Sequence, residues 1–179
     1  IAMAHHHPPM DLLVEYATGA LPVAQSACVA AHLSYCQRCR RLVDRLEDVG
    51  GAHLERLDPQ PVGESVLESV MARLDDPEPL RYAPNEVSDT QLPGLLDRLI
   101  NGNYADLAWK RVTQSLSISY LKTGDPNHEF ALYRIAEGGR IPEHTHGGSE
   151  MTLVLRGGFA DESGEYHPGD FLVREGCAC

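Results

Sequence analysis

The chain has 179 residues, of which 42% are hydrophobic, so it is long enough for one ordinary domain or two small ones and too apolar for wholesale disorder. No run approaches the roughly 18 apolar residues that span a bilayer, and no signal peptide opens the sequence, so we expect a soluble cytoplasmic protein. The net charge of −11 disfavours direct binding to nucleic acid, whose phosphates attract Lys and Arg, and favours a basic partner.

Residues 11–76 have a helical hydrophobic period, which predicts four short amphipathic helices. We expect the first to end at Gly19, the second to begin after Pro22 and the third to end at Gly50 and Gly51. The fourth carries five apolar residues on one face: Val66, Leu67, Val70, Met71 and Leu74. Four such helices bury only a thin core, so this unit needs a metal or a partner chain.

Prolines and acidic residues interrupt the helical pattern between residues 75 and 86. Such a composition is typical of an interdomain linker. We therefore predict an N-terminal domain over residues 1–77, a linker over 78–92 and a second domain over 93–179.

The second domain begins with a short helical segment, 95–100, after which the hydrophobic period becomes two. Short strands are predicted around residues 116–120, 130–133 and 151–155, with glycine turns after them. Short strands with regular turns indicate a β-barrel or jelly roll. The predicted fold is therefore an all-α four-helix domain followed by an all-β domain.

The five cysteines are an odd number in a chain without an export signal, which favours metal or redox chemistry over a disulfide framework. Three residues form the pattern His-x3-Cys-x2-Cys: His32, Cys36 and Cys39. Positions 32 and 36 share one face of a helix, and Cys39 comes within range if the chain turns at Gln37 and Arg38. Three such ligands leave tetrahedral zinc one ligand short.

A histidine ahead of the first helix can supply the fourth ligand. His7 is the first candidate, with His6 and His5 as alternatives. The competing interpretation is that His32 and the two cysteines only line an apolar stripe, because free cysteine is often buried. Cys28, one turn before His32, is interpreted as a core residue or a redox bystander.

A second group of metal-ligand residues lies in the β-rich half: His144, His146 and Glu150, between Gly138 and Gly157. Residues two apart in a strand point to the same side, so the two histidines share a face, and Glu150 begins the next strand. Two imidazoles and a carboxylate suit a divalent ion such as Zn, Fe, Mn or Ni. The alternative is a set of solvated side chains beside a glycine turn.

This second pattern resembles the first motif of the cupin family, and residues 166–170, Tyr-His-Pro-Gly-Asp, resemble the turn of the second motif. The His-x3-Cys-x2-Cys pattern resembles the zinc-binding anti-sigma family. Both motifs in this order, across nearly the whole chain, resemble ChrR-type anti-sigma factors with a C-terminal cupin-like domain. The segments 31–36 and 153–157 are also similar to that family.

The resemblance implies two metal sites. The ligands of an N-terminal zinc ion would be His7, His32, Cys36 and Cys39. Zinc or another divalent metal in the cupin half would have three of the usual four ligands: His144, His146 and Glu150. The fourth is usually a histidine beyond the Pro-Gly turn, and none follows His167, so we expect the sequence to lack part of this domain; Cys177 and Cys179 could substitute chemically.

The resemblance also implies a function. The chain would sequester an extracytoplasmic-function sigma factor, release it on oxidative stress such as singlet oxygen or peroxide, and so regulate transcription without touching nucleic acid or membrane. We expect no catalytic residue, and we expect the stress sensor to be the cupin metal site, with thiol oxidation second. The alternative function is a cupin metalloenzyme of the dioxygenase or isomerase type with an appended zinc-binding interaction domain, since an open metal position supports such chemistry.

Overall fold

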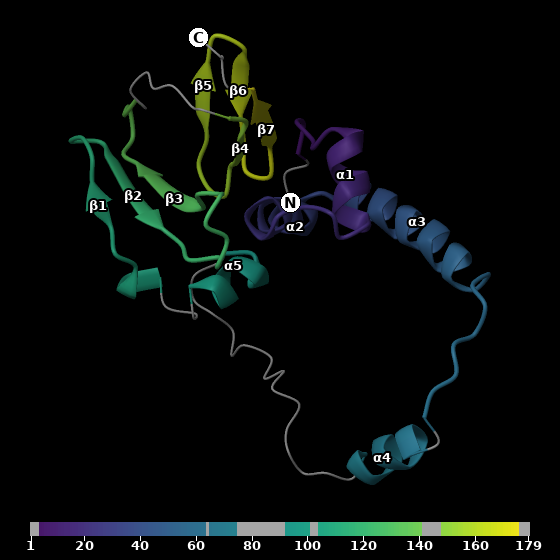
Figure 1. The fold of residues 1–179 in the computed structure, drawn as a ribbon. Helices are drawn as coiled ribbons and strands as arrows, with labels where there is room; N and C mark the ends of the chain where they lie inside the picture. Colours follow the sequence, from purple (N-terminus) through teal and green to yellow (C-terminus); the bar gives the residue numbers. More distant parts are fainter. Residues whose placement is uncertain (1–3, 64, 75–91, 101–103, 141–147, 176–179) are drawn as a thin grey trace.

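The computed structural model describes residues 4–63, 65–74, 92–100, 104–140 and 148–175 (Figure 1). A helical N-terminal region precedes a β-rich C-terminal region, as the sequence predicts. Within those ranges, every helix is too short or too polar to cross a membrane. The predicted linker falls almost entirely on residues 75–91, which lie outside the described residues, so the domain boundaries stay predictions.

Three helices pack against one another: α1 (Met10–Ala17), α2 (Val23–Tyr35) and α3 (Gln37–Leu54). Shortly after α1, Gly19 has a φ of +71°, which glycine adopts at little cost. Pro22 precedes α2, where its missing N–H removes no helical hydrogen bond. The predicted end of α3 at Gly50 and Gly51 is wrong. A glycine costs a helix only about 1 kcal/mol relative to alanine, and the amide of Glu55 still donates to Gly51 O at 3.0 Å.

The fourth helix, α4 (Ser65–Arg73), lies apart from α1–α3 (Figure 1). None of its residues is buried. Its apolar residues are all about half exposed or more: Val66, Leu67, Val70, Met71 and the following Leu74. The described residues therefore do not form a packed four-helix domain, because the stripe that would join α4 to the other helices faces solvent.

The described strands are short, and each of their pairings is antiparallel. One sheet has the order β1 (Lys110–Arg111), β2 (Leu116–Tyr120), β3 (Ala131–Ile135). Two further pairs are β4 (Glu150–Leu153) with β7 (Phe171–Arg174), and β5 (Phe159–Asp161) with β6 (Gly164–Tyr166). The described strands thus form three separate sheets, and the predicted closed barrel is not formed by them.

A short helix at the start of the C-terminal region, α5 (Gly94–Leu99), contacts α2. A 3-10 turn (Tyr104–Asp106) follows it and precedes β1. A small apolar cluster joins these segments to the sheet and is centred on the buried residues Ile100, Leu121 and Leu132. This cluster anchors the β1–β2–β3 sheet to the helical segment that precedes it.

The main hydrophobic core is shared by the two regions. Leu13, Val29 and Val43 come from α1, α2 and α3, and Phe171 comes from β7. Phe171 is only 2% exposed. The strand β4, the partner of β7, also contacts α2. The C-terminal strands therefore help to exclude water from the core of the three-helix unit, which compensates for the small size of that core.

Candidate metal centre

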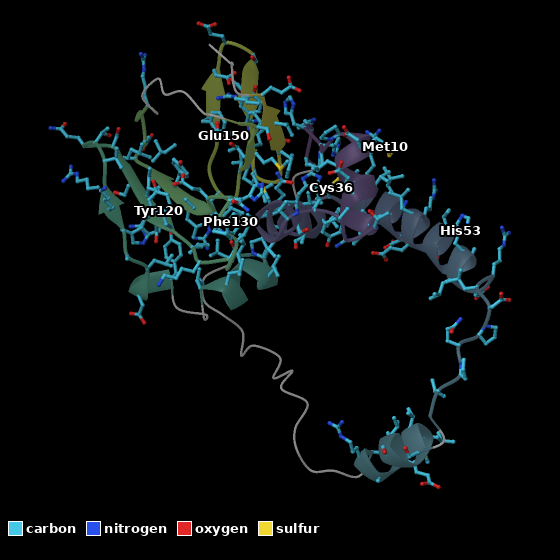
Figure 2. All side chains as sticks on the ribbon, in the orientation of Figure 1. Met10, Cys36, His53, Tyr120, Phe130 and Glu150 are labelled. Carbon is cyan, nitrogen blue, oxygen red and sulfur yellow. The ribbon has the colours of Figure 1, made fainter. Side chains whose placement is uncertain are left out.

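Four side chains with metal-ligating atoms meet where the helices pack on the C-terminal strands: His7, His32, Cys36 and Cys39. Their ligand atoms all lie within 4.8 Å of one another. Figure 2 shows Cys36 between the helices and the strands. His32, Cys36 and Cys39 are buried, and His7 is half-buried.

The junction of α2 and α3 positions the two thiols. Cys36 is the single residue between the helices, with φ −111° and ψ 101°, so the chain turns at Cys36 and not at the predicted Gln37 and Arg38. Its Sγ accepts a hydrogen bond from the amide of Cys39 at 3.4 Å, as an N-cap side chain does. The cap brings Sγ of Cys36 over the first turn of α3, where Cys39 projects.

His7 reaches both thiols from the segment before α1. Its Nδ1 lies 3.4 Å from Cys36 Sγ and 3.5 Å from Cys39 Sγ. Around tetrahedral zinc, with bonds of about 2.0 Å to nitrogen and 2.3 Å to sulfur, such atoms stand about 3.5 Å apart. Both nitrogen–sulfur distances are therefore those that a tetrahedral ion requires.

His32 has one ring nitrogen bound and one free. Nδ1 lies 2.7 Å from the carbonyl oxygen of Gly169, so it is the protonated donor, and Nε2 carries the lone pair. His32 is 0% exposed, and Nε2 finds no hydrogen-bond partner in the described part of the chain. Leaving a buried polar atom unpaired costs about 1–3 kcal/mol. A metal ion bound at Nε2 would remove that cost, so the donor set fits an ion.

The surroundings favour the neutral imidazoles of His7 and His32 and the protonated thiol of Cys39 when no ion is bound. Burial lowers the pKa of His32, and burial together with the charge of Arg38 lowers the pKa of His7. Burial, followed by the hydrogen bond with Cys36, raises the pKa of Cys39 to about 12. Neutral imidazole is the ligating form, whereas the thiols must release protons as the metal binds.

The other two candidate histidines, His5 and His6, are bound to Asp170 through their backbone amides. The amides of His5 and His6 donate to Asp170 Oδ1 at 2.6 Å and 2.9 Å. The ring of His6 lies against Tyr166, with centroids 4.9 Å apart. The sequence left three histidines open, and in the structure it is the ring of His7 that lies at the thiols.

Cys28 lies outside the cluster. It is 8% exposed and belongs to the core around Val29. Burial raises its pKa to about 12, which keeps the thiol protonated and unreactive. Of the two interpretations of Cys28, the structure favours the core residue.

The predicted cupin ligands are described only in part. Glu150 is the half-buried first residue of β4 (Figure 2). His144 and His146 lie outside the described residues, as do Cys177 and Cys179. His167 joins no group of ligand side chains among the described residues, and its amide donates to Asp170 Oδ2 at 2.8 Å. The cupin metal site stays a prediction.

Sequence reasoning gave no role to Gly169 and Asp170, although both lie in the motif that it singled out. Gly169 holds His32, and Asp170 holds the segment that carries His7. Their partners are 137 and 165 residues away in the chain. A spacing rule does not reach that far, and the only signal available in the sequence was an Asp directly after the Pro-Gly turn.

Comparison with known proteins gives three concordant matches. Residues 98–177 match the family described as the ChrR cupin-like domain. Over 170 residues the chain is 36% identical to the anti-sigma-E factor ChrR of Cereibacter sphaeroides, covering 95% of this chain and 79% of that protein. The fold is similar to a crystal structure of Rhodobacter sphaeroides SigE in complex with the anti-sigma ChrR, with a TM-score of 0.82 and 34% identity over 97% of this chain and 88% of the matched chain. The agreement of sequence and fold over both regions shows that the chain belongs to the ChrR family of anti-sigma factors.

Proposed function

We propose that this chain binds and sequesters an extracytoplasmic-function sigma factor and thereby regulates transcription. The observation that carries the proposal is the likeness, over 97% of the chain, to a solved structure of an anti-sigma factor in complex with a sigma factor. Such a role is regulatory and not enzymatic. Because sigma factors act with RNA polymerase, it also implies a cytoplasmic protein.

The apolar face of α4 is the proposed clamp for the sigma factor. Val70 and Met71 are 53% and 57% exposed, and α4 buries no residue of its own. An isolated helix of nine residues is marginal in water. An amphipathic helix that docks its apolar face in a groove of the partner gains both burial and helical order. The clamp therefore explains why this stripe has no cover within the described part of the chain.

Charge supports the same partner. Residues 1–85 contain twelve Asp and Glu against seven Arg. A negative surface accelerates encounter with a basic protein, while apolar contacts supply most of the affinity. We infer that acidic side chains steer the sigma factor to the helices and that α4 then holds it.

The proposed role of the N-terminal metal is structural. His7, His32, Cys36 and Cys39 would hold a zinc ion through two nitrogen and two sulfur atoms. All four positions would be filled by protein, which is typical of structural zinc and leaves no place for a substrate. When bound, the ion cross-links the segment before α1 to α2 and α3.

Co-purification tests the proposed function. The full chain, expressed with an extracytoplasmic-function sigma factor from the same genome, is expected to elute with it as one complex. It should also reduce transcription from the promoter of that sigma factor in vitro. A matched assay with the housekeeping sigma factor serves as control. Turnover of a small molecule by the chain, without binding to any such sigma factor, would instead support a cupin metalloenzyme.

We further propose that stress release begins at a divalent metal held by His144, His146 and Glu150. Glu150 opens β4, and β4 contacts α2, so a change at this end of the strand has a short path to the helices. Oxidation or displacement of a ligand would alter how β4 and β7 pack. A signal requires that the sigma factor bind the two states with different free energies.

The sensor proposal predicts a variant that inhibits normally and responds poorly. His144→Ala with His146→Ala should lose one metal per chain by elemental analysis and still bind the sigma factor. After singlet oxygen or an organic peroxide, release of the sigma factor should be blunted. His53→Ala with His128→Ala removes two histidines outside both proposed sites and should respond like the unchanged chain. Normal release from the first variant would return sensing to the cysteines.

A further inference from the structure

We propose that residues 167–171 of the C-terminal region form the outer shell of the N-terminal metal centre, so that its zinc affinity depends on the packing of the two regions. The inference rests on the zinc centre proposed above. It goes further because it names residues that bind no metal, on the other side of the interface between regions, as positioning residues for the ligands.

Gly169 orients the first ligand. Its carbonyl oxygen accepts the Nδ1–H of His32 at 2.7 Å, which selects the tautomer with the lone pair on Nε2. The ring of Phe171 lies at 5.7 Å from the ring of His32, at an interplanar angle of 76°, and limits its rotation. Histidine ligands of metals usually donate their second N–H to such an acceptor, which fixes the ring and raises its basicity. Here the acceptor is 137 residues away from the ligand.

Asp170 holds the segment that carries the second ligand. Its carboxylate is 0% exposed and accepts the amides of His5, His6 and His167 at 2.6, 2.9 and 2.8 Å. The amide of Phe171 donates to His6 O at 3.0 Å, which adds a backbone bond to the same segment. The residue directly after these contacts is His7. The C-terminal turn therefore determines the position of His7 relative to the two thiols.

The turn leaves no space between the regions. Gly169 has a φ of +96°, and a Cβ there would lie 2.8 Å from the Cβ of Tyr35 and 3.4 Å from the Cβ of Ala4. Tyr35 is the last residue of α2, directly before Cys36. A side chain at position 169 would have to push the turn away from α2, and the carbonyl oxygen that holds His32 would move with it.

The same turn is also hydrogen-bonded to the strands. The amide of Gly169 donates to Val154 O at 2.8 Å, and the amide of Val154 donates to Asp170 O at 3.0 Å. Val154 directly follows β4. A shift of β4 would thus move both Gly169 and Asp170. The two equilibria are coupled reciprocally. If a rearrangement of the strands weakens zinc binding by some factor, loss of zinc favours that rearrangement by the same factor.

Two variants of the full chain test the inference. Gly169→Ala displaces the carbonyl oxygen, and Asp170→Asn sets an NH2 group against a backbone N–H and removes the charge. Each is expected to weaken Zn²⁺ affinity about 10–100-fold, the usual effect of losing an outer-shell partner. Affinity is measured by competition with a chromophoric chelator. The d–d and thiolate charge-transfer bands of the Co²⁺-loaded chain should also change, because the ligand geometry changes.

Matched controls exist for both variants. Gly124 has a φ of +80° with nothing within 4 Å of a Cβ, so Gly124→Ala adds similar backbone strain elsewhere. Asp125 accepts the amide of Asn127 in the loop between β2 and β3, so Asp125→Asn removes a hydrogen-bonded carboxylate outside the proposed outer shell. Both controls should keep Zn²⁺ affinity within about twofold and keep the Co²⁺ spectrum.

Hydrogen exchange on the unchanged chain gives a second test that does not depend on a variant folding. Zn²⁺ should slow exchange in the peptide 166–175 and leave 116–135, which covers β2 and β3, unaffected. Unaltered Zn²⁺ affinity in both variants, or no protection of 166–175, would overturn the inference. If the unchanged chain and Cys36→Ser bind Zn²⁺ alike, the zinc centre itself is wrong, and this inference falls with it.

Discussion

Replacing Cys36 or Cys39 by serine is expected to remove the N-terminal zinc, unfold α1–α3 and release the sigma factor. Each substitution deletes one thiolate from a four-ligand cluster whose atoms lie within 4.8 Å of one another. Zinc contributes about 10–16 kcal/mol to the folding of zinc-finger peptides near neutral pH. That is comparable to the about 5–15 kcal/mol by which whole domains are stable. The three-helix unit has a thin core even with Phe171 of β7 packed on it, so it cannot replace a contribution of that size.

The measurements are zinc content by elemental analysis, helix content by far-UV circular dichroism and co-elution with the sigma factor. Cys28→Ala is the matched control, because it deletes a buried thiol outside the cluster and adds no polar group. We expect it to cost about 1 kcal/mol of stability and to keep zinc and binding. A serine variant that has lost one zinc ion per chain but stays folded and inhibitory would show that the N-terminal metal is dispensable.

Replacing Val70 and Met71 by aspartate is expected to abolish sigma binding without unfolding the protein. Both side chains are more than half exposed, and α4 contributes no buried residue, so the fold does not depend on them. If they are the centre of the clamp, each should contribute about 2 kcal/mol or more to binding. A combined loss of about 4 kcal/mol weakens Kd roughly 1,000-fold.

Ser69→Asp with Ala72→Asp is the matched control, because it adds the same two charges to the opposite face of α4. Its affinity should stay near that of the unchanged chain, since added negative charge does not oppose a basic partner. Both variants should keep zinc and helix content. Undiminished inhibition by the Val70 and Met71 variant would place the sigma-binding surface elsewhere.

Local spacing made much of this protein readable from its sequence. The helical period predicted α1, α2 and the existence of α4, alternation predicted β2 and β3, and a compact apolar run predicted β4. The pattern His32, Cys36, Cys39 marked the metal centre because residues four apart share a helix face. These features depend on contacts within a few residues, which one short stretch of sequence encodes by itself.

Tertiary packing decided the rest. The end of α3 was misjudged because exposed glycines weaken a helix without ending it. The selection of His7 over His5 and His6 depends on Asp170, which is 165 residues from His5 in the chain. The tautomer of His32 depends on Gly169, which packs where no other residue fits. The sequence by itself determined which residues could bind a metal, and the docking of the C-terminal strands on the helices decided which of them meet, because contacts over such separations follow from shape and burial and not from spacing.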